Sequence, residues 1–366
     1  MRIANKQIAV MDGLSSRVID SQLMSDRILF QVDLAPGETR TFYILDSSAL
    51  AAVPPPIVKT FARYVPERVD DFAWESDRVA HRMYGQAVIK AENLISSGID
   101  AWEKRTRALV LDHWYKDGDY HNDHGEGMDS YRVGRSRGDG GLGIWDGKNL
   151  YVSGNYQTWK VITTGPIRSE FELTYDAWDA GGRKISETKR ISIDAGSNMS
   201  RAESVFSSDD KSPLQVGVGL AERPTTIGTN QIPILGDMPI LGHLFHSGIV
   251  QDKENGWQTY WQPTDRDRGN IAVAVVLPNG ITQFVKETNS FPAPAAADLA
   301  APAAEGMPPV ANLLAIAPAE VGKPFVYYFG AGWSLSGDFP NPEAWNKYVS
   351  RFAERLKAPL QVTVGN

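Results

Sequence analysis

The densest cluster of chemically versatile side chains is the decapeptide YHNDHGEGMD at residues 120–129. It holds two of the six histidines of the chain, placed among carboxylates and glycines with little apolar content. His121, His124 and Glu126 together would offer two imidazoles and one carboxylate, which suits zinc or another transition metal, although their spacing matches no metalloprotease signature. Without a metal, the same imidazoles would exchange protons near neutral pH, with Tyr120 and the carboxylates beside them. A solvated turn without chemistry is the third interpretation.

Three arginines, Arg132, Arg135 and Arg137, fall within the next segment, SYRVGRSRGDGGLGIW. Guanidinium groups bind carboxylate or sulfate with two parallel hydrogen bonds, and neighbouring glycines let the backbone approach a ligand closely. The glycine run at 138–143 contains neither the dinucleotide-binding pattern nor a P-loop lysine. The segment therefore predicts either an anion-binding site or a solvated basic loop.

Upstream, the segment WESDRVAHRMYG at residues 74–85 has the alternation of one β-strand. One face would carry Glu75, Asp77, His81 and Met83, and the other would carry Trp74, Arg78, Arg82 and Tyr84. Both faces are too charged for an ordinary core, so we expect the segment to line a cleft or to form a salt-bridge network. Tyr84 beside Arg82 or Arg78 would combine a proton donor with a carboxylate clamp.

Aromatic clusters elsewhere offer a second kind of binding surface. Trp257, Tyr260 and Trp261 lie in GWQTYWQP, and Trp333 lies in GAGWS. Such rings stack on sugars in binding proteins, although burial in the core is their commoner fate.

The composition limits the classes of function. The 366 residues carry 37 Lys and Arg against 44 Asp and Glu, a formal charge of −7, which disfavours nucleic-acid binding. The absence of cysteine excludes disulfides, thiolate metal sites and a cysteine nucleophile. No stretch has the apolar length of a membrane span, and MRIANKQIAV is too polar for a signal peptide. We expect a soluble protein of the periplasm or the medium, with the cytoplasm as the alternative.

The elements that must position these residues are mainly strands. The segments 18–23, 27–34 and 39–45 alternate polar and apolar residues and predict an N-terminal β-meander within residues 1–50. From 150 to 206, long alternating segments separated by turn residues predict a large antiparallel sheet, which continues to about 334. We therefore expect one mainly β domain over residues 1–366, a large antiparallel β-sandwich with a few peripheral helices.

Helices and loops are predicted at four places. The spacing of apolar residues predicts a helix over 99–116. Asn341 is a suitable N-cap for a C-terminal helix that begins at Pro342, after which LQVTVGN predicts a short final strand. The Ala/Pro tract at 291–309 predicts an exposed loop, and residues 231–245 predict a loop between strands.

Several blocks of the chain together resemble the domain-of-unknown-function family 4861, which occurs in bacterial polysaccharide-utilisation loci. The blocks are YVPERVDDFAWESDRVAHRMYG, GIDAWEKR, WYKDGDYHNDHGEGMDSYRVG, GGLGIW, ETKRISIDAGSNMSR and YYFGAGWSLSGDFP. The resemblance spans about residues 28–360 and implies a β-sandwich of the galactose-mutarotase type. It further implies an oligosaccharide dehydratase, as in a member that acts on ulvan fragments and leaves a 4,5-unsaturated uronic acid. His81 and residues 231–245 depart from the family pattern.

That chemistry needs a cation to neutralise the uronate carboxylate, a base for the C5 proton and an acid for the departing hydroxyl. The resemblance therefore predicts His121 and His124 as the proton-transfer centre, with Glu126 orienting one imidazole and Tyr84 and Tyr120 as further proton donors. Substrate binding is assigned to Arg78, Arg82, Arg132, Arg135, Arg137, Trp74 and Trp333. No cofactor is required in this scheme, and a divalent metal on His121, His124 and Glu126 is the alternative. The expected partner is an acidic oligosaccharide.

Three competing functions stay open on the sequence. Paired carboxylates from among Glu75, Asp77, Glu126 and Asp129 would suit a glycoside hydrolase. A polysaccharide lyase would use the same elimination chemistry but release a sugar. A carbohydrate-binding protein without catalysis would need only the aromatic surfaces.

Overall fold

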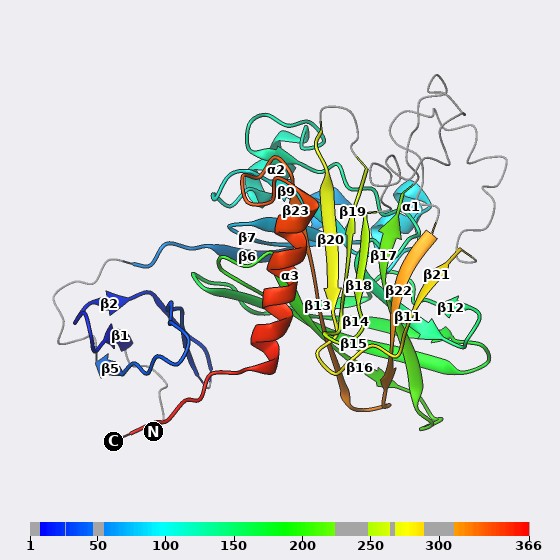
Figure 1. Cartoon of the computed structure of the whole chain (residues 1–366). Helices are drawn as coiled ribbons and strands as arrows, with labels where there is room; N and C mark the ends of the chain where they lie inside the picture. Colours follow the sequence, from blue (N-terminus) through cyan, green and yellow to red (C-terminus); the bar gives the residue numbers. More distant parts are fainter. Residues whose placement is uncertain are drawn as a thin grey trace, which may run out of the picture.

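A computed structural model describes residues 8–25, 27–46, 55–223, 248–263, 268–288 and 311–365 (Figure 1). The chain is mainly β, built from antiparallel sheets with three α-helices among the described residues, one of them near the C-terminus. This confirms the predicted fold class. Residues 231–245 and 291–309, both predicted as loops, lie outside the described residues. None of the helices in the described ranges has the length and apolar content that crossing a bilayer needs.

An eight-stranded antiparallel sheet is the largest element, with the strand order β13-β14-β15-β16-β23-β20-β19-β18. Its long central strands alternate buried and partly exposed residues, so one face packs on the core. Phe171, Leu173 and Tyr175 of β14 point into that core. The strands of this sheet are β13 (Thr158–Thr163), β14 (Arg168–Asp179), β15 (Lys184–Asp194), β16 (Met199–Ser207), β18 (Ile249–Asp252), β19 (Trp257–Trp261), β20 (Ile271–Val276) and β23 (Pro324–Trp333).

Two five-stranded sheets cover the inner face of the eight-stranded sheet. The first, in the order β10-β9-β8-β7-β6, consists of β6 (Thr60–Val65), β7 (Asp71–Ser76), β8 (Val79–Met83), β9 (Asp100–Lys104) and β10 (Gly127–Met128). The second, in the order β12-β11-β17-β22-β21, consists of β11 (Asp139–Trp145), β12 (Leu150–Tyr151), β17 (Leu214–Glu222), β21 (Gln283–Glu287) and β22 (Ala311–Ala319). All three sheets contribute side chains to one hydrophobic core.

The two smaller sheets meet at a parallel bridge between Ile99 and Gly138. Gly138 has a φ of +59°, and a Cβ atom there would lie 2.1 Å from the Ile99 carbonyl oxygen. Only glycine fits this conformation and this approach. The bridge therefore fixes the chain between β10 and β11, the part that carries the predicted arginines.

The N-terminal strands form two small sheets beside the sandwich, as Figure 1 shows. One sheet has the order β2-β1-β5, from β1 (Ile8–Asp12), β2 (Val18–Ile19) and β5 (Phe42–Asp46), and the other pairs β3 (Ser21–Leu23) with β4 (Ile28–Phe30). Because β5 pairs with β1 rather than with β4, the prediction of a simple meander is wrong. The Gln22 side chain ties these strands to the sandwich, since its amide oxygen accepts from the backbone N–H groups of Ile167 and Arg168. The assignment of residues 1–366 to one domain stays a prediction.

The C-terminal helix α3 (Pro342–Lys357) confirms the predicted cap. The Asn341 side chain accepts a hydrogen bond of 2.9 Å from the backbone N–H of Ala344, and Pro342 occupies the first helical position. The helix packs Trp345 and Val349 against the outer side of β19 and β20. The final strand is a wrong prediction, because residues 359–365 form no strand and are exposed.

Two further predictions of local structure are wrong. The segment 99–116 is not one helix, because it contains strand β9 and only then the short helix α2 (Leu111–Asp117). The segment 74–85 is not one strand, because the chain reverses between β7 and β8 and the two strands pair with each other. The remaining short helices are α1 (Gln86–Glu92) and the 3-10 turn η2 (Pro66–Arg68).

Candidate active site

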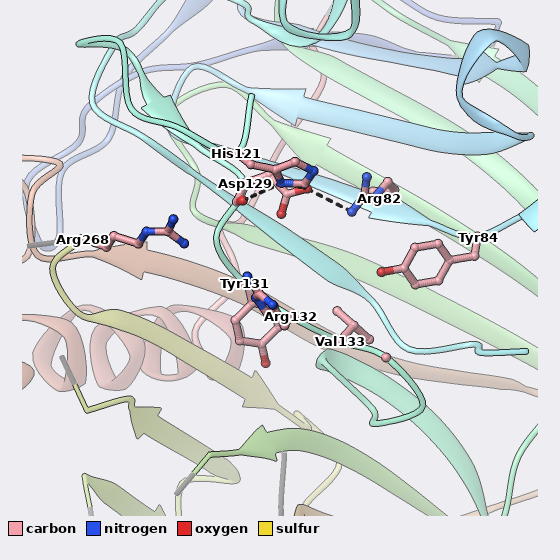
Figure 2. A pocket seen from close by; sticks show the side chains of 9 residues that line it. Arg82, Tyr84, His121, Asp129, Tyr131, Arg132, Val133 and Arg268 are labelled. Atoms are coloured by element: carbon pink, nitrogen blue, oxygen red, sulfur yellow. Dashed lines mark hydrogen bonds and ion pairs between the residues drawn. The ribbon is translucent and has the colours of Figure 1, made fainter. Parts of the chain in front are cut away.

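A pocket of about 260 Å³ lies between the first five-stranded sheet and the loops that lead into β11 and β20 (Figure 2). Four residues predicted from the sequence line it: Arg82, Tyr84, His121 and Arg132. Its other lining residues are Asp129, Tyr131, Val133, Gly134 and Arg268. The pocket therefore joins side chains from β8, from the loop after α2, from the segment after β10, and from a loop more than a hundred residues later in the chain.

Arg82 forms the buried side of the pocket and is surrounded by carboxylates. Its Nη2 atom lies 2.5 Å from Asp100 Oδ2 and 3.0 Å from Asp129 Oδ2, and its Nη1 atom lies 3.6 Å from Asp71 Oδ2. Burial raises the pKa of Asp71 and of Asp100 to about 7, and that of Asp129 to about 6. Because its charge is balanced by these groups, Arg82 holds the wall of the pocket rather than offering an unpaired cation to a ligand.

His121 is fixed by Asp129 at the pocket. Its Nδ1 atom lies 3.0 Å from the Asp129 carbonyl oxygen and 3.5 Å from Asp129 Oδ2. An Nδ1–H that donates to the carbonyl leaves Nε2 of the neutral ring as the proton acceptor. The imidazole also packs on the Tyr120 ring at 4.5 Å between centroids, and half of the side chain remains exposed. His121 is thus an oriented and accessible imidazole.

Tyr84 supplies a hydroxyl at the opposite end of the pocket from Arg268, and Figure 2 shows this hydroxyl directed into the space between them. The Arg82 guanidinium lies over the Tyr84 ring, with its central carbon 5.5 Å from the ring centroid. Burial and then the charge of Asp100 raise the Tyr84 pKa well above its ordinary value. The hydroxyl is therefore protonated at neutral pH and can act as a hydrogen-bond or proton donor.

Arg132 and Arg268 bring positive charge to the rim of the pocket. Within the described ranges, the Arg268 guanidinium has no carboxylate partner, whereas its backbone carbonyl accepts a hydrogen bond of 2.8 Å from Trp333 Nε1. The Arg132 carbonyl accepts from Arg223, whose guanidinium lies over the Tyr131 ring. These two arginines are the groups best placed to receive an anion.

Glu103 supports the floor of the pocket from strand β9. Its carboxyl oxygens accept from the backbone N–H of Ser130 at 3.1 Å and pair with the Ser130 hydroxyl at 2.9 Å. Ser130 lies between Asp129 and Tyr131, two of the lining residues. Burial raises the Glu103 pKa to about 8, so this group carries a proton at neutral pH.

Other predicted catalytic residues lie outside the pocket. His124 is two-thirds exposed and pairs with Asp119 at 2.9 Å. Glu126 accepts from His113 Nε2 at 2.7 Å and from Trp114 Nε1 at 3.1 Å, so it orients neither predicted imidazole. Tyr120 is buried and its hydroxyl accepts from Arg68 Nε at 3.1 Å.

The predicted metal alternative is not assembled. His121, His124 and Glu126 each pair with a different partner. No group of three His, Asp or Glu side chains in the described ranges is arranged to hold a metal ion.

The remaining predicted binding residues also lie apart from the pocket. Arg78 pairs with Asp338, and Arg135 is exposed in a turn. Arg137 is 1% exposed and donates to Ser97 Oγ and to the carbonyl of Arg135, so its guanidinium lies in the core. Trp74 and Trp333 are fully buried.

Three residues that line the pocket, Asp129, Tyr131 and Arg268, are absent from the predicted dehydratase site. Asp129 belongs to the YHNDHGEGMD cluster, where the sequence predicts it only as a hydrolase carboxylate, and Tyr131 precedes Arg132 in a segment that predicts no role for it. Arg268 lies far along the chain, in a segment without a motif, so no local signal could have found it.

The chain matches the family described as Domain of unknown function (DUF4861) over residues 2–362. It belongs to this family. A relative from Formosa agariphila, named Uncharacterized protein P7, is 32% identical over 377 residues, which cover 98% of this chain and 85% of that protein. The resemblance of the DUF4861 blocks to this sequence is therefore confirmed at the level of the family.

Solved structures offer more distant similarities. A candidate kojibiose phosphorylase from the human microbiome matches 83% of this chain and 37% of its own, with 8% identity and a TM-score of 0.39. The galactosidase domain of the α-galactosidase–sucrose kinase AgaSK matches 75% of this chain and 42% of its own, with 8% identity and a TM-score of 0.35. The chain thus spans less than half of either solved chain, and similarity at this level carries no argument about function.

Proposed function

We propose that this DUF4861 protein is a carbohydrate-active β-eliminating enzyme, a dehydratase that acts on the non-reducing-end uronic acid of an acidic oligosaccharide. The observation that carries the proposal is the pocket, which combines an oriented imidazole, a protonated phenol and two rim arginines. These are the three functions that elimination next to a carboxylate requires. The family resemblance to an oligosaccharide dehydratase supports the same reaction.

In this proposal, Arg132 and Arg268 bind the uronate carboxylate. Their positive charge withdraws electron density from the carboxylate, makes the C5 proton more acidic and stabilises the charge that develops when it leaves. Guanidinium forks are suited to this task because they pair with both carboxylate oxygens. Arg82 is a positioning residue, since its charge is already paired with Asp100 and Asp129 through its Nη2 atom.

His121 is the proposed base and Tyr84 the proposed acid. His121 Nε2 removes the C5 proton, the C5–H electron pair forms the C4=C5 double bond, and the C4–O bond breaks. The Tyr84 hydroxyl donates its proton to the departing oxygen, which leaves as water. The proton on His121 then returns to Tyr84 through solvent, so the enzyme ends the cycle unchanged. Asp129 keeps the imidazole in the tautomer that this step needs.

The pocket favours elimination over glycoside hydrolysis. Hydrolysis by retention or inversion needs two carboxyl groups on either side of the glycosidic bond. Asp129 is the one carboxylate among the described residues that line the pocket. Glu75 is fully buried and engaged with Lys104 and with the backbone of Val110, so it is not available to a sugar.

The size of the pocket suits one sugar unit. Its volume of about 260 Å³ lies below the roughly 300–1,000 Å³ of pockets that enclose drug-sized ligands. A terminal residue of a chain therefore fits better than several consecutive residues. An enzyme that acts on such fragments would work in the periplasm or the medium.

The test is product analysis on uronic-acid oligosaccharides. The proposal expects ultraviolet absorbance of an unsaturated uronate together with a product that has lost one water and kept all its sugar units. A product that has lost a sugar would indicate a lyase, and a new reducing end without unsaturation would indicate a hydrolase. Either result would replace the proposed reaction.

A further inference from the structure

Trp159 differs from the other tryptophans of this chain. All ten tryptophans lie within the described residues, and nine are buried or partly buried. Trp159, on β13, is 44% exposed. Of the residues that the sequence offered as stacking surfaces, Trp257, Tyr260 and Trp333 are buried and Trp261 is partly buried. The exposed indole thus occurs at a place that no motif indicated.

The ring of Trp159 is held in a fixed orientation at the edge of the sandwich. It stacks on Tyr64 with 5.0 Å between centroids and 15° between planes, and its centroid lies 6.1 Å from that of the core residue Phe72. Strands β13 and β6, which carry Trp159 and Tyr64, are the edge strands of their sheets. Trp159 therefore lies where the two sheets meet, with its exposed part facing solvent.

The partner ring is itself anchored by a strained turn. The Tyr64 hydroxyl donates to the Asp70 carboxylate, and the Tyr156 hydroxyl donates to the Asp70 carbonyl at 2.5 Å. Val69 and Asp70 have φ values of +44° and +64°, a conformation that is costly for residues other than glycine. Such a conformation persists only where the surroundings enforce it, so the ring pair is rigid before any ligand arrives.

We propose that Trp159, backed by Tyr64, is a second carbohydrate-binding site that stacks on a pyranose ring of a polysaccharide chain. The apolar face of a sugar ring packs on an indole, and a fixed platform loses little conformational freedom on binding. Neither residue lines the pocket. This inference rests on the proposed function only for the class of ligand, a carbohydrate. The site would hold the protein on the polymer and would take no part in catalysis.

The test distinguishes stacking of Trp159 on a sugar from a purely structural role in covering Phe72 at the sheet edge. Trp159→Ala removes both the ring and the apolar cover of Phe72, whereas Trp159→Leu keeps the cover without an aromatic face. Ile162→Ala is the matched control, because Ile162 is 38% exposed on the same strand. Thermal melting reports any loss of packing, and affinity electrophoresis in gels that contain ulvan, alginate or xylan reports binding.

The proposal expects retardation of the wild type by at least one of these polysaccharides. Trp159→Ala and Trp159→Leu should raise the dissociation constant by about three- to tenfold, the size of one stacking contact, while Ile162→Ala leaves it unchanged. Retardation of Trp159→Leu equal to that of the wild type overturns the proposal, as does a wild type that none of the three gels retards. Retardation in the gel measures binding and needs no turnover, so failure of the proposed dehydration would leave this result intact.

Discussion

Glu103 is predicted to be protonated in the folded protein, and Glu103→Gln tests this directly. In the structure, Ser130 donates to one carboxyl oxygen of Glu103 from its backbone N–H and to the other from its hydroxyl. When the carboxyl is protonated, the Ser130 hydroxyl turns to accept from it, since a hydroxyl both donates and accepts. A glutamine amide reproduces both hydrogen bonds and has nearly the same shape. The substitution therefore leaves the native contacts in place and removes only the titration.

The expected effect follows from the shift in pKa. Burial raises the pKa of Glu103 from 4.5 to about 8, so the folded state holds a proton that the unfolded state releases above its ordinary pKa. Stability that is fully present below pH 4.5 is therefore lost as the pH rises towards 8. Each pH unit in this window costs up to about 1.4 kcal/mol, so between about pH 5.5 and 7.5 the variant should gain about 2 to 3 kcal/mol over the wild type.

Urea unfolding at several pH values measures this difference. Both proteins are unfolded and refolded at each pH, and the difference in free energy of unfolding is plotted against pH. Glu126→Gln is the control, because His113 lowers the pKa of that partly exposed carboxylate and its removal should bring no gain at higher pH. A difference between Glu103→Gln and the wild type that stays constant with pH would refute the argument, since it would mean that Glu103 is ionised in the fold.

Three further predictions concern the rim of the pocket, the joint between the sheets and the exposed loop. Arg268→Ala should lower kcat/KM for a uronate oligosaccharide by roughly a hundredfold, with partial recovery in Arg268→Lys, because a lysine keeps the charge but not the bidentate geometry; an unchanged kcat/KM in steady-state assays would remove Arg268 from substrate binding. Gly138→Ala should lower Tm by several degrees in calorimetry, because its Cβ would lie 2.1 Å from the Ile99 carbonyl oxygen, and a wild-type Tm would show that the joint is adaptable. His124→Ala should keep activity within about twofold, since the pairing with Asp119 is exposed and outside the pocket; a loss above tenfold would return His124 to the reaction.

The regular parts of the fold could be predicted because one face of each long strand is buried. Strands such as β14 and β15 alternate buried and exposed residues, and the cap and apolar spacing of α3 are local signals. The prediction of one helix over 99–116 failed because β9 is buried on both faces and shows no alternation of polar and apolar residues. Its pattern could therefore not be distinguished from that of the helix that follows. The N-terminal pairing of β5 with β1 depends on contacts between distant segments, which no local pattern records.

The site could be predicted only in part, for the same reason. The YHNDHGEGMD cluster and SYRVG identified His121 and Arg132, because both belong to dense local motifs. The motif could not say which histidine faces the pocket, since that depends on whether Asp119 or Asp129 pairs with it. Arg137 was misplaced because a guanidinium is normally a surface group, and here hydrogen bonds to Ser97 and to a backbone carbonyl keep it in the core.

The assignment of His121 as base and Tyr84 as acid is tested by comparing His121→Ala, Tyr84→Phe and the wild type on one uronic-acid oligosaccharide. Formation of the unsaturated, dehydrated product is followed by absorbance and mass spectrometry. Each substitution removes a different proton-transferring group from the pocket. Circular dichroism establishes that the variants are folded. We expect dehydrated product from the wild type and a loss of at least about a hundredfold in kcat for each variant, the usual contribution of a general acid or base. Dehydration at the wild-type rate by folded His121→Ala would contradict this assignment.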